Sequence, residues 1–197
     1  MLERLGSLLV GYLFGNFLTA EIVVQKKTGK RARAIGSGNP GMANVSANLG
    51  IKSGLLVLAG DMLKTILAVF ISQWLFKGIG DLAVFYTGLG TVTGHNYPVW
   101  NRFKGGKGVA VTCMYIVLAS PFWGVLSCGV GLVLVLVSRF LPFGGVVIPA
   151  VFSIPAFIFF GAEAGLTILA AVLLSVLRFY SDLKTRFEKK ITGIHGR

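Results

Sequence analysis

Two basic, glycine-rich loops interrupt a chain that is otherwise almost entirely apolar. The first reads Gly-Ser-Gly-Asn-Pro-Gly-Met-Ala-Asn over residues 36–44, and the second covers residues 95–108 and ends in Phe-Lys-Gly-Gly-Lys-Gly. Glycine has no Cβ, so backbone N–H groups can approach an anion closely, and lysine supplies the compensating charge. This composition predicts that both loops hold phosphate groups at a membrane surface.

The first loop offers side-chain and backbone groups that suit an anionic ligand. The Ser37 hydroxyl can donate to or accept from a phosphate or acyl oxygen, and Asn39 and Asn44 carry amide donors. The glycines that would let the backbone approach the ligand are Gly36, Gly38 and Gly41. The same residues are also typical of a flexible turn. The loop alone leaves both interpretations open.

The second loop resembles a shortened phosphate cradle. Lys104 and Lys107 alternate with Gly105, Gly106 and Gly108. The loop lacks the full Gly-x-x-x-x-Gly-Lys-Ser/Thr pattern, so an ATP site is not supported. The alternative is an anchor for lipid headgroups, which any basic cytoplasmic loop can provide.

His95 is the one histidine before the C-terminal tail, and it is a candidate general base because its pKa is ordinarily near neutrality. A lone histidine also commonly serves as a structural hydrogen-bonding residue. Asp61 and Lys64 lie three residues apart on one face of an apolar segment, which favours an internal ion pair facing the bundle. No cluster of metal ligands and no His-x-x-x-x-Asp box is present in the sequence, so we expect neither metal nor cofactor.

Composition identifies the elements that must position these loops. Hydrophobic residues make up 54% of the 197-residue chain and charged residues 13%, against about 25% charged residues in an ordinary soluble domain. Apolar runs of nearly twenty residues predict an all-α, polytopic membrane helix bundle of about seven transmembrane helices, forming a single domain over residues 1–197. The predicted segments are residues 5–24, 54–76, 79–97, 109–120, 124–138, 141–160 and 163–179.

The distribution of basic residues predicts the orientation of the bundle. All but three of the 19 lysines and arginines fall on loops or tails that would share one side of the membrane. Of the remainder, Arg4 and Lys77 fall on the opposite side and Lys64 lies within a span. By the positive-inside rule, the N-terminus is outside, and both glycine-rich loops and the C-terminus are cytoplasmic. The net charge of +12 therefore indicates topology and does not predict nucleic-acid binding.

Glycines recur four residues apart at Gly11 and Gly15, at Gly90 and Gly94, and at 161 and 165. Small residues at this spacing allow close packing of membrane helices. We expect helix contacts at all three pairs.

The order and separation of these motifs resemble one family. Gly-Ser-Gly-Asn-x-Gly is followed by Asn44-Val45, and an Asp-x-x-Lys motif lies at Asp61 and Lys64. Gly-His-x-x-Pro-Val at residues 94–99 then leads into Phe-Lys-Gly-Gly-Lys-Gly-Val-Ala at residues 103–110. The chain thus resembles the bacterial glycerol-3-phosphate acyltransferases that use acyl phosphate, the PlsY type.

The resemblance implies an enzyme of phospholipid biosynthesis in the bacterial cytoplasmic membrane, with its active site on the cytoplasmic side. It would move a fatty acyl group from acyl phosphate to the sn-1 hydroxyl of glycerol 3-phosphate, giving lysophosphatidic acid and phosphate. Ser37, Asn39 and the backbone of residues 36–41 would form a phosphate and oxyanion pocket, and Lys104 and Lys107 would hold the second phosphate. The base could be His95 or the substrate's own phosphate. The implied partners are the two substrates and the bilayer, with a monomer plausible.

Four positions depart from the family pattern. Ala43 stands where the family usually has threonine, and Ala47 where it has arginine. Phe179 and Asp182 replace a histidine and an asparagine after the last helix, where Arg178 could supply lost charge. These departures favour an alternative function: a non-catalytic or transport-like membrane protein that binds an anionic lipid or phosphate through the same loops.

Overall fold

The computed structural model describes residues 1–191, with side chains as far as Lys184, and every regular element in that part is helical. The all-α prediction is therefore confirmed. The long helices are α1 (Leu2–Gly15), α2 (Thr19–Thr28), α3 (Met42–Leu49), α4 (Ile51–Leu75), α5 (Leu82–Asn96), α6 (Val109–Ala119), α7 (Pro121–Ser138) and α8 (Leu141–Ile191). Short 3-10 turns cover Ala32–Ala34, Lys77–Ile79 and Val99–Asn101. Of the predicted basic tail, the side chains of Arg186, Lys189 and Lys190 and all of Arg197 lie outside the described part.

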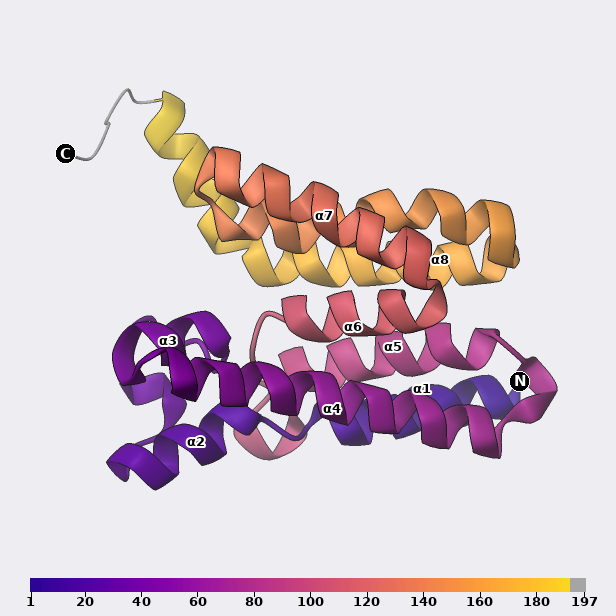
Figure 1. Ribbon diagram of the computed structural model, residues 1–197, viewed down its shortest axis with the longest axis horizontal. Coiled ribbons are helices and arrows are strands. Elements are labelled where there is room, and N and C mark those ends of the chain that lie inside the picture. The colour runs from indigo at the N-terminus through magenta and orange to yellow at the C-terminus, as the bar shows by residue number, and fades with distance from the viewer. Residues whose placement is uncertain (192–197) are drawn as a thin grey trace.

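The helices form two layers that run along the long axis of the molecule. Helices α1, α4, α5 and α6 make one layer, and α7 and α8 make the other (Figure 1). Helix α8 folds back on itself at Gly161, where φ is 86° and ψ is 175°, so residues 141–160 and 162–191 run in opposite directions. The predicted sixth and seventh segments are these two halves.

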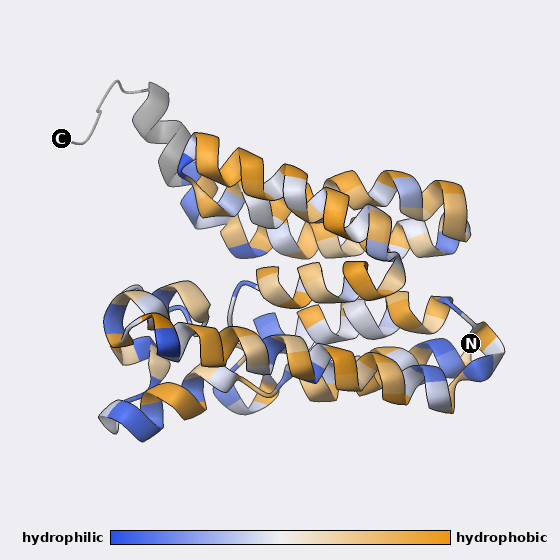
Figure 2. Cartoon of the chain, in the orientation of Figure 1, coloured by the Kyte–Doolittle hydropathy of each residue, from blue (hydrophilic) through white to orange (hydrophobic). Residues whose placement is uncertain are grey.

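The protein is an integral membrane bundle. Four helical stretches are long and apolar enough to cross a bilayer: Leu2–Thr28, Ile51–Leu75, Pro121–Ser138 and Leu141–Lys184. Hydrophilic residues gather at the two ends of the long axis, as expected if that axis crosses the membrane (Figure 2). The number of crossings and the side on which each terminus lies stay predictions.

The first predicted segment is not continuous. Helix α1 ends at Gly15, and Leu18 is extended (φ −100°, ψ 99°) before α2 begins at Thr19. The Asn16 side chain stabilises the break, since its amide donates to Tyr12 O and its Oδ1 accepts from Val99 N. The sequence pattern missed this break because the partner of Asn16 lies far along the chain.

Helices α1 and α5 pack backbone against backbone. A Cβ at Gly11 or Gly15 would overlap a carbonyl oxygen of α5, and one at Gly90 or Gly94 would overlap a carbonyl oxygen of α1. The helix packing predicted for these two glycine pairs is confirmed. In the third pair, a Cβ on Gly165 would overlap the Phe157 ring of the other half of α8, so a helix contact is present there. Gly161 has no neighbour within 4 Å of its Cβ position, and its positive φ instead supplies the turn inside α8.

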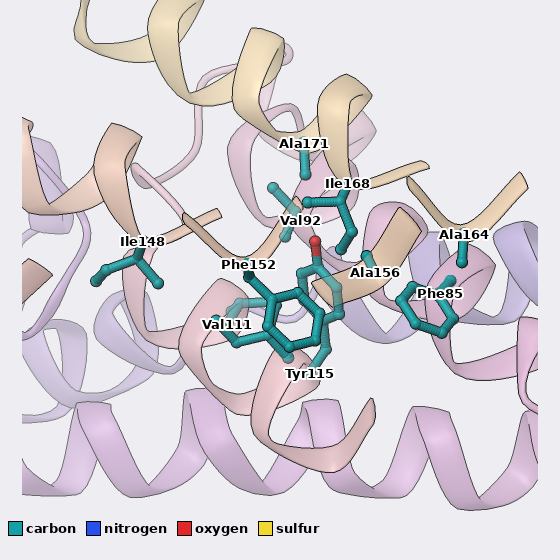
Figure 3. Close-up of a cluster of buried hydrophobic side chains, with 11 residues drawn as sticks. Phe85, Val92, Val111, Tyr115, Ile148, Phe152, Ala156, Ala164, Ile168 and Ala171 are labelled. Atoms are coloured by element: carbon teal, nitrogen blue, oxygen red, sulfur yellow. The ribbon is translucent and has the colours of Figure 1, made fainter. Parts of the chain in front are cut away.

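A hydrophobic core joins the two layers. Phe85 of α5, Tyr115 of α6 and Phe152 of α8 are fully buried members of this core (Figure 3). At the end of the bundle where α1 begins, the Arg4 guanidinium pairs with the Glu163 carboxylate, which also accepts a 2.7 Å hydrogen bond from the hydroxyl of Tyr86. These contacts fix α8 against α1 and α5.

The α1–α5 contact can be tested by adding a single methyl group. Gly90→Ala places a Cβ against Leu8 O, so the helices must separate, which we expect to cost about 1–3 kcal/mol of stability. Gly129→Ala on α7 is the matched control, because no atom lies within 4 Å of its Cβ position. Thermal unfolding in detergent should show a lower Tm for the Gly90 variant alone. Equal Tm values would contradict the close contact.

Candidate functional site

The Asn44 side chain organises the first glycine loop. Asn44 lies in the first turn of α3, where its Oδ1 accepts a 2.9 Å hydrogen bond from Ser37 N and its Nδ2 donates to Ile35 O at 3.1 Å. The Asn48 amide also donates to Asn44 Oδ1. Gly36 has a φ of +49°, and a Cβ there would overlap the Asn48 and Asn44 side chains. The Asn44 side chain therefore fixes the conformation of the loop that carries Ser37.

Ser37 itself is exposed on this loop, and its hydroxyl accepts from Asn39 N at 3.4 Å. Two buried polar atoms beside it, Arg33 Nε and Asn39 Oδ1, have no hydrogen-bond partner within the described part of the chain. Buried polar atoms are rarely left unpaired, so these two atoms can pair with water or with a polar ligand at the loop. At the base of the loop, Glu21 accepts from Ala32 N at 2.9 Å and fixes where the loop leaves α2.

A buried charged network lies beneath the loops. Asp61 and Lys64 are 3% and 4% exposed, and their charged atoms are 2.8 Å apart. The Lys64 ammonium also donates to Gly15 O and Phe17 O, two carbonyls of the break between α1 and α2. The predicted internal pair facing the bundle is present, and it has the further function of satisfying the broken helix.

His95 extends this network to the second loop. Its Nδ1 lies 2.8 Å from Lys64 Nζ, and its backbone oxygen accepts from Gly106 N at 2.9 Å. A Cβ on Gly106 would overlap His95 Nε2, so the loop backbone lies directly against the imidazole. With 3% exposure and protein groups at both ring nitrogens, His95 fits the structural alternative better than the role of general base.

The second loop is tied to the last helix by Arg178. The guanidinium of Arg178 donates to Gly105 O at 2.8 Å and to Gly106 O at 2.9 and 3.0 Å. The ammonium of Lys107, which is predicted to hold a phosphate, is paired in the structure with Asp182, whose Oδ2 lies 2.5 Å from its Nζ. Gly108, with a φ of +72°, turns the chain into α6.

Lys104, unlike Lys107, has an exposed side chain on a turn with strained backbone angles. Arg102 and Phe103 before it both adopt left-handed backbone angles, which costs about 1–3 kcal/mol per residue. The Asn101 amide donates to Lys104 O at 2.9 Å and closes this turn. The Lys104 side chain is exposed and forms no ion pair with any residue whose side chain is described. Its ammonium is therefore available to an anion.

Arg178 bonds to the second loop, and its charge lies within electrostatic range of Arg33, a like charge that precedes the first loop. Both loops also lie at the same end of the bundle (Figure 1). The sequence interpretation did not include Arg33 or Arg178 among the site residues. The available signal was an arginine directly after the last apolar run, where an unpaired charge would be costly.

Two apolar pockets flank Phe17 at the break in the first span. One, of about 370 Å³, lies between α1 and α4; Leu13 and Leu67 line it, and Lys64 is its charged lining residue. The other, of about 350 Å³, reaches Glu21 and extends to the second loop at Trp100. Both pockets therefore connect an apolar surface to the residues that support the loops.

Removing one charge of the Asp61–Lys64 pair should destabilise the protein more than removing both. Lys64→Met leaves the Asp61 carboxylate buried without its partner, which typically costs about 3–5 kcal/mol. The double variant Asp61→Asn with Lys64→Met removes both charges and should unfold at a higher temperature than Lys64→Met alone. Tm measurements in detergent compare the two. If the double variant is less stable than Lys64→Met by as much as Asp61→Asn alone destabilises the protein, the two residues are not a coupled pair.

Comparison with known proteins assigns the family. The family model described as glycerol-3-phosphate acyltransferase matches residues 5–189. Glycerol-3-phosphate acyltransferase 1 of Lactobacillus johnsonii is 41% identical over 96% of this chain and 91% of its own length. The glycerol-3-phosphate acyltransferase of Alkaliphilus metalliredigens is 34% identical over 91% of this chain and 92% of its own.

A solved membrane protein has the same fold. The crystal structure of PlsY (YgiH), an integral membrane glycerol 3-phosphate acyltransferase, in its glycerol 3-phosphate form superimposes with a TM-score of 0.82. The alignment covers 98% of this chain and 94% of that one, at 30% identity. The chain therefore belongs to the glycerol-3-phosphate acyltransferase family.

Proposed function

We propose that this acyltransferase moves a fatty acyl group from acyl phosphate to the sn-1 hydroxyl of glycerol 3-phosphate, giving lysophosphatidic acid and phosphate. The observation that carries the proposal is the pair of glycine-rich loops at one end of the bundle, the second of which is held by Arg178, within a chain of this family. The solved PlsY forms hold glycerol 3-phosphate and lysophosphatidic acid, which are the acceptor and product named here.

For this reaction the protein mainly has to position the two substrates and stabilise the negative charge that develops in the transition state. Acyl phosphate is a mixed anhydride and already activated, so the acceptor hydroxyl can attack its carbonyl directly. The bond between the carbonyl carbon and the bridging phosphate oxygen breaks, and phosphate leaves. Binding groups must align hydroxyl and carbonyl and stabilise the developing negative charge. No covalent intermediate on the protein is required.

The exposed groups of the loops suit these tasks. The Ser37 hydroxyl can donate to the developing oxyanion, and the Lys104 ammonium can bind a phosphate. Asn39 and the backbone of residues 36–41 would complete the first pocket, and the backbone of residues 105–108 would line the second. Because His95 is enclosed, the hydroxyl proton would pass to the acceptor's own phosphate.

The acyl chain needs an apolar surface that begins beside these loops. The two pockets at the break between α1 and α2 provide one, because they are lined mostly by apolar side chains and the second of them reaches Trp100 of the second loop. A chain lying between α1 and α4 would remain in contact with the bilayer. This arrangement would let a membrane-embedded tail meet a water-soluble acceptor.

The first test separates an enzyme from a protein that only binds phosphate. Ser37→Ala and Lys104→Ala should each lower turnover by about 10²–10³, the usual cost of removing one transition-state donor. Phosphate release from palmitoyl phosphate in the presence of glycerol 3-phosphate measures the effect. Lys77→Ala, at the opposite end of the bundle, is the control and should leave the rate unchanged. Wild-type protein that binds acyl phosphate but never turns it over would establish the non-catalytic alternative.

The second test concerns the side of the membrane on which the site lies, which we propose is the cytoplasmic side of the bacterial inner membrane. Single cysteines replace Lys30 or Arg102 in a background without Cys113 and Cys128. They should resist impermeant thiol reagents in intact cells and react after lysis. A cysteine at Lys77 should react in intact cells. Labelling at Arg102 from outside would overturn the orientation.

A further inference from the structure

Two residues that depart from the family pattern face the same lysine of the second loop. Asp182 Oδ2 lies 2.5 Å from Lys107 Nζ, and the Phe179 ring centroid lies 4.9 Å from the same nitrogen. They are three residues apart and therefore on one face of α8. The Phe179 ring is fully buried and packs on Gly145, where a Cβ would overlap it. The ammonium of Lys107 is thus held between a carboxylate and an aromatic face.

This contact lies on side chains that water can reach. The side chain of Lys107 is 27% exposed and that of Asp182 is 36% exposed. A phosphate arriving at the second loop can therefore approach Lys107, where it meets an ammonium already paired with a carboxylate. Asp182 both limits where the ammonium can lie and reduces the positive charge that a phosphate experiences.

The ion pair is not what holds the loop to α8. Arg178 does that independently, through three hydrogen bonds to the carbonyl oxygens of Gly105 and Gly106. Asp182 contacts the loop through the Lys107 side chain and also lies within electrostatic range of Arg178. Loss of the carboxylate therefore frees the ammonium without releasing the loop backbone.

We propose that Asp182 is a positioning residue that acts through Lys107: it holds the ammonium over Phe179 in the orientation used during acyl transfer, at the cost of weaker phosphate binding in the ground state. This inference rests on the proposed acyl transfer. Asp182 and Phe179, the two residues of α8 that depart from the family pattern, then act together on Lys107.

The test is the isosteric change Asp182→Asn, which removes the charge and keeps the shape. The freed Lys107 should bind the acceptor phosphate more tightly, lowering the KM for glycerol 3-phosphate about threefold, the range measured for partly exposed ion pairs. The misplaced ammonium should also lower kcat about fivefold, since small errors in placement reduce rates. Asp182→Glu, which keeps the carboxylate, should restore both constants toward wild type.

A double-mutant cycle shows whether Asp182 acts through Lys107. In a Lys107→Ala background, Asp182→Asn should change neither KM nor kcat further. Asp81→Asn, at the opposite end of the bundle, controls for loss of one acidic charge. Additive effects in the cycle, or a lower Tm with unchanged KM and kcat, would overturn the positioning role. A wild-type protein without acyl phosphate turnover would instead contradict the proposed function, so the two failures are distinguishable.

Discussion

The Lys64 ammonium satisfies a helix break that would otherwise be costly in a membrane. Unpaired backbone groups in the bilayer cost several kcal/mol each, and the break between α1 and α2 exposes carbonyls that Lys64 binds. Asp61 neutralises the buried ammonium, and His95 Nδ1 meets it at 2.8 Å. Gly106 N donates to His95 O, so the second loop lies directly against this network.

The glycine contact between α1 and α5 makes that network possible. Only where two backbones nearly touch can the break in α1 and His95 of α5 both lie within reach of one α4 lysine. From this rigid base, α8 returns across the bundle and places Arg178 on the loop carbonyls. The binding groups thus sit on loops whose backbone is fixed by buried partners, which is the condition for preorganised charge stabilisation.

The sequence predicted features that depend on local spacing. The Asp61–Lys64 pair follows from three-residue spacing on a helix, and the Gly11 and Gly90 packing follows from four-residue spacing. The break after Gly15 was missed because apolar residues continue through it, and α3 was missed because its residues were assigned to the first loop. The turn at Gly161 falls between the predicted sixth and seventh segments. The partners of Lys107 and the Gly105 carbonyl lie more than seventy residues away along the chain, where no local pattern can reveal them.

We propose that the two loops form one site that transfers an acyl group from acyl phosphate. The most direct measurement gives purified protein palmitoyl phosphate or palmitoyl-CoA as donor, with radiolabelled glycerol 3-phosphate, and quantifies lysophosphatidic acid and released phosphate. We expect one phosphate released for each lysophosphatidic acid formed from palmitoyl phosphate, and no product from palmitoyl-CoA. Product from palmitoyl-CoA but none from palmitoyl phosphate would contradict the account.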